Sequence, residues 1–367
     1  RCVCHVMNLC VQDGLNCAEA IIKPFREIVL HLRHSGIKRD DFKRLCLEHN
    51  LPFRRFKLDC KTRWNSTYDM LAMLITYKVP LIQFSETINS LGGVIDESTF
   101  SLIDNLVNLL AVFYSCTKLL SGSHYPTSHL ALQALVRISY TFGNFSRNAP
   151  FGDIIGEMEK KFLKYYDEIP QLFLIASILD PRIKEKWVQT LLELFGQCFV
   201  GNPNFAVDFS KMYQNAISNV QAVFDLYENK FGSTSMSTTT SMPSSSTFAI
   251  NPLALVRSKH SSSIPSCHGE YVLYNNTPIV EGNDDDSFDI LTWWKSNSIN
   301  FPILAKMAKD FLSPPVSTVP SESAFSASGR IFTKKRSKLA PNTLEASICL
   351  KNWLGVAGGK RQQKEYE

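Results

Sequence analysis

Apolar residues recur at three- and four-residue spacing along most of this 367-residue chain, which is the period of amphipathic α-helices. From Trp64 to about Phe231 the pattern is helical almost throughout. One apolar run in that stretch closes at Asp180-Pro181, because a proline disfavours the helical conformation of the residue before it. The pattern therefore predicts a mainly α protein.

Three helices and one strand are predicted before residue 65. A mostly buried helix ends near Gly14, a second helix stops at Gly36, and a short third helix covers residues 40–50. Residues 53–59 alternate apolar and basic side chains, which is the pattern of a β-strand.

The pattern changes twice after residue 231. Residues 232–268 open with a run made almost entirely of Ser and Thr, which cannot bury enough apolar surface to offset the entropy of ordering, so we expect a disordered linker. Helical spacing returns over residues 269–358. There we expect an aromatic helix, a helix that starts at Pro302 and is capped by Asn300, and a last helix with one apolar stripe.

The apolar residues of this last segment exceed what a segment of its size can bury within itself. Two alternatives are open: they pack on helices upstream, or they form an interface between subunits, where aromatic side chains are the usual anchors. The candidate interface residues are Phe288, Leu291, Trp293, Trp294, Ala346, Cys349, Leu350, Trp353 and Leu354.

The spacing of the cysteines and the distribution of charge indicate which classes of protein the sequence does and does not fit. The ten cysteines are never spaced as CxxC pairs, which argues against a disulfide framework and a four-ligand zinc site and favours reduced thiols in an intracellular protein. The net charge is +5, but residues 1–63 hold 13 Lys and Arg against 7 Asp and Glu, an excess of +6. A basic first segment is compatible with a polyanionic partner. No apolar run approaches the roughly 18 residues of a membrane helix.

Two short motifs near the start could carry chemistry. Cys2 and His5 have the spacing of two zinc ligands, but no matching second pair exists, so no metal is expected there. Arg63 and Trp64 combine a phosphate-binding side chain with a ring that could stack on a base, although such pairs are also common as surface cation–π contacts or core anchors. The basic residues just before this pair are candidate DNA contacts: Arg54, Arg55 and Lys57.

Two further motifs lie near the end. Glu322 is the one acid in "STVPSESAFSASGR", where Pro320 suits a first helical turn and the helix dipole favours a carboxylate. A basic run follows, which could contact phosphates, act as a nuclear import signal or be a solvated loop. Its members are Arg330, Lys334, Lys335, Arg336 and Lys338.

Each motif is weak alone, but their order along the chain is specific. "RCVCHVMNLCVQDGL", "CKTRWNSTYDML", "IASILDPRIK" and the block from "PPVSTVPSESAFS" to "LEASICLKNWL" together resemble the hAT superfamily of DNA transposases. The likeness is greatest to its plant RICESLEEPER/DAYSLEEPER branch, and it spans almost the whole chain.

The resemblance implies an RNase H-like core interrupted by an all-helical insertion. On that basis residues 1–64 are a partial core, 65–231 the insertion, 232–268 the linker and 269–358 the dimerisation region. In active relatives two Asp and one Glu hold two Mg²⁺ or Mn²⁺ ions, and Glu322 matches that Glu. Cys2 and His5 match the family's CxxH motif, and Arg63-Trp64 its RW motif, whose Trp stacks on a flipped base.

Two departures from the family pattern bear on catalysis. Ser323 stands where most members have Arg. Both family Asp residues lie upstream of the RCxxH motif, at which this sequence begins with Arg1, so we expect a fragment that is catalytically incomplete and holds no cofactor of its own. The Mg²⁺ or Mn²⁺ belongs to active members, and zinc belongs to a BED finger upstream.

Three hypotheses follow. The chain is a transposase-derived nuclear protein that binds DNA and itself; or it is part of an active cut-and-paste transposase; or it is a helical interaction module with no role on DNA. No membrane partner is expected under any of them.

Overall fold

The structure is a computed structural model that describes residues 2–88, 91, 93, 95–199, 208–232, 268–281, 288–331 and 340–357. Within these ranges the protein is helical and contains no β-strand, which confirms the mainly α prediction. The helices are α1 Val3–Cys17, α2 Glu19–His34, α3 Gly36–Glu48, α4 Trp64–Ile75, α5 Lys78–Glu86, α6 Glu97–Leu120, the 3-10 helix η1 Ser128–Leu130, α7 Ala131–Asn144, α8 Phe151–Tyr166, α9 Gln171–Ile178, α10 Lys184–Gln197, α11 Phe209–Phe231, α13 His268–Asn276, α14 Ile290–Asn297, α15 Pro302–Leu312, α16 Val319–Ile331 and α17 Pro341–Ala357.

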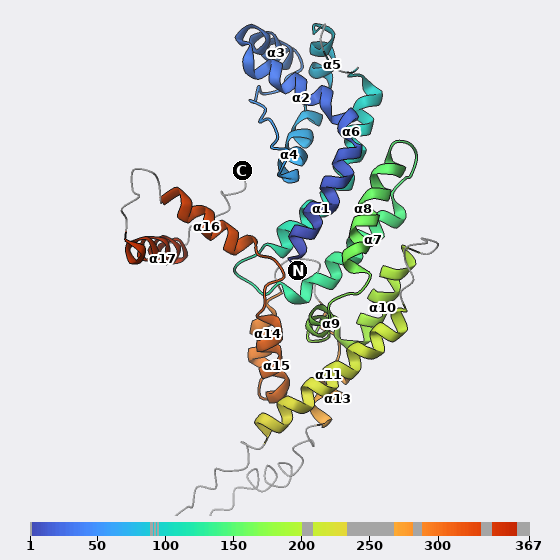
Figure 1. Ribbon diagram of the computed structural model, residues 1–367, viewed down its shortest axis with the longest axis vertical. Helices are drawn as coiled ribbons and strands as arrows, with labels where there is room; N and C mark the ends of the chain where they lie inside the picture. The colour runs from blue at the N-terminus through green and yellow to red at the C-terminus, as the bar shows by residue number, and fades with distance from the viewer. Residues whose placement is uncertain are drawn as a thin grey trace, which may run out of the picture.

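Helix α1 lies at the centre of the body and packs on both α8 and α6 (Figure 1). The prediction that this helix ends near Gly14 is wrong, because α1 continues to Cys17. Gly14 instead lies where α1 meets α8: an added Cβ would stand 2.6 Å from the side chain of Met158. The absence of a side chain at Gly14 therefore allows the two helices to approach closely.

The strand predicted over residues 53–59 is also wrong. Residues 51–60 are an extended segment with no neighbouring strand in the described part of the chain to complete a ladder. Its alternation has another cause: Phe56 is buried against Phe42 and Tyr77, with ring centroids 5.7 and 5.2 Å apart. The Tyr77 hydroxyl also donates to the Pro52 carbonyl over 2.6 Å.

Helices α13, α14 and α15 pack beneath the body against α9, α10 and α11 (Figure 1). Pro302 begins α15 as predicted, but Asn300 does not cap it, because the residue before the helix is Phe301. Glu270 of α13 does so from a distance: its buried carboxylate accepts from the backbone N–H groups of Ile303 (2.9 Å) and Leu304 (2.7 Å). A carboxylate at the positive end of a helix satisfies donors that the helix itself leaves open.

Helices α16 and α17 form an arm that projects from the body in Figure 1. They pack against each other, and a strap of residues 313–318 joins them to the rest of the molecule. We call these two helices the arm and that segment the strap.

Helix α6 is the one helix among the described residues that is long and apolar enough to cross a membrane. Core helices of globular proteins share these properties, and α6 packs against α1, α4 and α7. Its length and composition therefore do not define a membrane segment.

Candidate functional site

The strap brings the first motif of the sequence, at Cys2, close to the segment that precedes Glu322. The two meet at the start of α1. Val3 donates its backbone N–H to the Val316 carbonyl over 2.9 Å, and Thr318 donates its N–H to the Cys2 sulfur over 3.3 Å. The strap is held from its other side as well, since Val316 donates to the Thr127 hydroxyl over 3.2 Å. Cys2 and the helix that carries Glu322 are therefore neighbours, although more than 300 residues separate them in the chain.

Hydrogen bonds at this junction change the ionisation of the thiols. Burial raises the pKa of Cys2, but hydrogen bonds from Thr318, the His5 backbone and Ser317 outweigh it and lower the pKa below its ordinary value. Burial raises the pKa of Cys4, and the nearby Glu322 carboxylate adds to that increase.

Glu322 itself is exposed in the first turn of α16. Its Oε1 accepts from the Thr318 hydroxyl over 2.6 Å, and its backbone N–H donates to the Thr318 carbonyl over 2.9 Å. Both bonds fix the carboxylate at the base of the arm. The helix N-terminus also favours its negative charge, as the sequence predicts.

The donors around Glu322 do not fit a site for two divalent metal ions. Mg²⁺ and Mn²⁺ prefer several oxygen ligands, including more than one carboxylate when two ions are held. Here one carboxylate faces the Thr318 hydroxyl, and the nearby sulfur of Cys2 is a soft donor. No group of three or more His, Cys, Asp or Glu in the described ranges is arranged to hold a metal ion.

The two residues of the Arg63-Trp64 motif lie in different environments, Arg63 at the surface and Trp64 in the core. Arg63 is exposed at the start of α4. Trp64 is only 3% exposed and meets the Tyr114 ring edge-on, with centroids 6.4 Å apart. The base-stacking role predicted for Trp64 is therefore not available in this conformation, and its indole acts as a core anchor.

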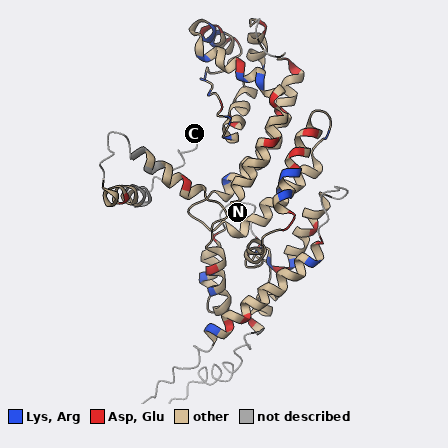
Figure 2. Cartoon of the chain, in the orientation of Figure 1, with Lys and Arg blue, Asp and Glu red and all other residues tan. Residues whose placement is uncertain are grey.

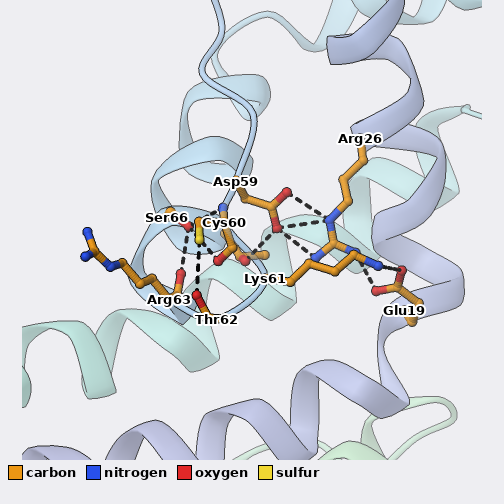
Figure 3. Close-up of polar contacts among 9 residues, drawn as sticks. Glu19, Arg26, Asp59, Cys60, Lys61, Thr62, Arg63 and Ser66 are labelled. Carbon is orange, nitrogen blue, oxygen red and sulfur yellow. Dashed lines mark hydrogen bonds and ion pairs between the residues drawn. The ribbon is translucent and has the colours of Figure 1, made fainter.

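A buried ion pair that the sequence analysis missed holds the turn before Arg63 (Figure 3). Arg26 of α2 donates to the Asp59 carboxylate from Nε to Oδ1 over 3.0 Å and from Nη2 to Oδ2 over 2.7 Å. The Asp59 side chain is 1% exposed and also accepts from Thr67 over 2.8 Å. Arg26 makes a second ion pair with Glu19, to which Lys61 is bound as well. Bidentate Arg–carboxylate geometry of this kind fixes position as well as charge.

Hydrogen bonds of Ser66 complete the turn. Its hydroxyl accepts from the Cys60 N–H over 2.7 Å and donates to the Arg63 carbonyl over 2.7 Å. Arg63 therefore lies at the end of a turn that the hydrogen bonds of Ser66 stabilise. No pattern in the sequence could indicate the Arg26–Asp59 pair, because its partners are 33 residues apart and on different elements.

The other candidate DNA contacts differ in where they lie. Arg54, Arg55 and Lys57 are exposed along the extended segment that leads to this turn, and Figure 2 shows further Lys and Arg positions in blue on α2 and α3. The side chain of Arg330 lies outside the described residues, as do Lys334, Lys335, Arg336 and Lys338. Arg54, Arg55, Lys57 and Arg63 are therefore the described part of the candidate DNA surface.

The residues predicted for a dimer interface also separate into two groups. Trp294 is 4% exposed, and its Nε1 donates to the Leu179 carbonyl over 3.0 Å. Trp293 is half-buried against Phe301, and Phe288 lies under the Arg182 guanidinium at 4.6 Å. The assignment of Trp294 to an interface is therefore wrong: it packs upstream on the protein's own core. Leu291 remains 47% exposed.

Residues 179–184, "LDPRIK", contact the C-terminal helices α13 and α14 through Lys184 and Leu179. We call this segment the seat. The buried Lys184 ammonium donates to the carbonyls of Tyr274 (2.9 Å) and Thr277 (2.7 Å), at the end of α13. The Tyr274 hydroxyl donates in return to the Ile178 carbonyl over 3.0 Å. These bonds satisfy groups at helix ends that would otherwise be buried without partners.

The seat also contains a network of buried charged and titratable side chains. The Asp180 carboxylate is fully buried and accepts from the Arg182 side chain over 3.0 and 2.7 Å. His129 lies with its Nε2 3.9 Å from Asp180. Burial lowers the pKa of His129 to about 4, with Arg182 acting in the same direction and Asp180 opposing it. His129 is therefore neutral near pH 7.

The apolar side chains of the arm are exposed to solvent, whereas those packed on the seat are buried. Leu350, Trp353 and Leu354 of α17 are 54%, 66% and 62% exposed, and Phe325 of α16 is 77% exposed. Ala346 is exposed and Cys349 half-buried on the same helix. The stripe predicted from the sequence thus exists on α17 and faces outward.

Comparison with known families defines the class of protein that these features belong to. Residues 270–354 match the model of the hAT family C-terminal dimerisation region, residues 1–94 match the ZBED1 RNase-like helical domain, and residues 133–229 match the hAT-like transposase RNase-H fold. The chain is thus related to transposases by its body as well as by its C-terminal region. It belongs to the hAT family.

Individual relatives agree with this assignment. A Zea mays protein that carries the name AC transposase is 29% identical over 97% of this chain and 44% of its own length. The zinc finger BED domain-containing protein RICESLEEPER 2 of Oryza sativa subsp. japonica is 25% identical over 96% of this chain and 50% of its own length. The Arabidopsis thaliana protein DAYSLEEPER is 25% identical over 81% and 40%. The chain spans about half the length of the curated relatives it matches.

Proposed function

We propose that the chain is a hAT transposase-derived nuclear protein that binds DNA and associates with itself, and that its own residues do not cleave DNA. The observation that carries the proposal is the location of the matched dimerisation region. It ends on an arm whose apolar stripe faces solvent, while exposed basic residues lie on the body, in the segment between α3 and α4.

The basic surface supports the DNA-binding part. Arg54, Arg55 and Lys57 project from one extended segment, and Arg63 follows on a turn that Asp59 and Arg26 hold in place. Arginine contacts to phosphate give affinity without reading sequence. Several relatives are named zinc finger BED domain-containing proteins, so we expect sequence-specific binding to depend on a zinc-holding domain of that type.

The donor set at Glu322 supports the absence of cleavage. A single exposed carboxylate beside a hydroxyl and a thiol offers too few hard oxygen ligands for a pair of Mg²⁺ or Mn²⁺ ions. We therefore expect the 367-residue chain to leave transposon-end DNA intact in either ion.

The second candidate function is a part of an active transposase. It is favoured by the spatial pairing of Cys2 with the strap that precedes Glu322, which keeps two family motifs together. A nicking assay separates the two candidates. If the chain cleaves transposon-end DNA in Mg²⁺ or Mn²⁺, and Glu322→Gln abolishes the cleavage, the second candidate is correct.

The experiment on DNA binding compares two triple variants with the same change of charge. Arg54→Ala/Arg55→Ala/Lys57→Ala removes the proposed contacts, and Lys118→Ala/Lys164→Ala/Lys186→Ala removes exposed cations elsewhere on the body. Fluorescence anisotropy with a labelled duplex at low salt should show at least tenfold weaker binding for the first variant than for the second. Equal affinities would mean that the extended segment is not the DNA surface.

A further inference from the structure

The matched dimerisation region has two parts with opposite environments. Its first part, helices α13–α15, contributes buried residues to the core of its own chain, including Tyr274, Trp294 and Leu304 at 0%, 4% and 0% exposure. Its last part, α17, exposes the side chains of its apolar stripe. A surface already buried within one chain cannot also cover a second copy without unfolding.

From this division we infer that self-association uses the arm alone, with the stripe of Leu350, Trp353 and Leu354 packing on the same stripe of a second copy. This inference rests on the proposed function, since it identifies the surface and the partner of the self-association proposed above. Helices α13–α15 then have a different role: they anchor the arm to the body through the seat.

The size of the stripe supports an interface. Its three side chains present roughly 400 Å² of apolar surface, given the about 150–250 Å² that one large aromatic side chain can bury. The largest contiguous apolar patch on a typical monomer is about 300–600 Å² and is often functional. Two such stripes with the helix surface beside them approach the about 1,000 Å² that a specific interface requires.

The spacing of the stripe favours pairing with its own copy. Leu350, Trp353 and Leu354 stand at i, i+3 and i+4 on α17, the side-chain arrangement that packs into the grooves of another helix. A two-fold axis through two α17 helices places the same patch against itself, as isologous dimers require. Other exposed large apolar residues, such as Ile37, Tyr140 and Trp187, lie on three separate helices of the body.

Sedimentation of the whole chain tests the inference with a matched tryptophan. Trp353→Ala should weaken self-association at least about 30-fold and leave the helical content by circular dichroism unchanged, since truncation of a central aromatic anchor has effects of that size. Trp187→Ala removes a Trp of similar exposure (51%) on α10 and should leave the dimer unchanged. If Trp353→Ala dimerises like the wild type, the arm is not the interface, although the proposed self-association stands. If the wild-type chain is monomeric at all concentrations, both statements fail.

Cys349 provides a readout for the arm-to-arm geometry. It lies half-buried on α17, next to Leu350, so a short bismaleimide should join the Cys349 residues of two copies. The covalent dimer should disappear in Cys349→Ser and persist in Cys17→Ser/Cys60→Ser, which removes the two cysteines that are exposed in the described part of the body. A dimer by sedimentation that gives no Cys349-dependent cross-link would overturn the pairing of arm with arm.

Discussion

Replacing Trp294 with alanine should destabilise the protein rather than dissociate it. Truncation of a buried Trp costs about 3–5 kcal/mol, and the Leu179 carbonyl loses its donor, which costs about 1 kcal/mol more. The ring also packs against Tyr274 and Trp293, with centroids 5.3 and 5.0 Å away. The expected loss of about 4–6 kcal/mol is a large share of the total stability of an ordinary domain.

Urea unfolding followed by circular dichroism measures this loss. Because the free energy of unfolding falls by about 1–3 kcal/mol per molar urea, Trp294→Ala should lower the midpoint by more than about 1 M. Trp187→Ala, whose side chain is half exposed, should change the free energy by about 0.5 kcal/mol or less. An unchanged midpoint for Trp294→Ala together with a shift from dimer to monomer would refute the reasoning and return Trp294 to the interface.

Two further predictions concern buried charges. Arg26→Ala should lower the free energy of unfolding in urea by about 3 kcal/mol, because it leaves the 1%-exposed Asp59 carboxylate without its cation. Glu19→Gln, at the 44%-exposed end of the same network, should lower it by less than about 1 kcal/mol. Equal effects of the two variants would contradict the argument from burial. The pKa of His129 is about 4 in the folded protein and about 6.5 in the unfolded chain. Between these pH values the unfolded chain binds one more proton than the folded protein. The free energy of unfolding should therefore fall by up to about 3 kcal/mol as the pH drops from 6.5 to 4. His129→Asn should flatten that part of the pH profile, and a profile parallel to the wild type would contradict it.

Local patterns predicted the helices because amphipathic spacing reports directly on burial. The start of α15 at Pro302 and the existence of the apolar stripe on α17 are both readable in the sequence, but the exposure of that stripe is not. The strand over residues 53–59 was not, because alternation shows only that every other side chain is covered. Here Phe42 and Tyr77 provide the cover, and no neighbouring strand exists in the described residues.

What the sequence left open depends on contacts between distant segments. Whether Trp294 served a core or an interface could not be decided without the Leu179 carbonyl, 115 residues away. The sequence predicts Asn300, two residues before Pro302, as the cap of α15, but the buried Glu270 takes that role from another helix. At the candidate site, no pattern in the sequence indicates that Cys2 and Glu322 lie near each other, because the strap that joins them appears only in three dimensions.

The salt dependence of DNA binding by the 367-residue chain tests the central claim most directly. If Arg54, Arg55, Lys57 and Arg63 contact phosphates, the logarithm of the association constant for a random-sequence duplex should fall linearly with the logarithm of salt concentration, with a slope of about −3 to −4. The slope should be the same for duplexes of unrelated sequence. Absence of binding at low salt, or an affinity that salt leaves unchanged, would contradict the account.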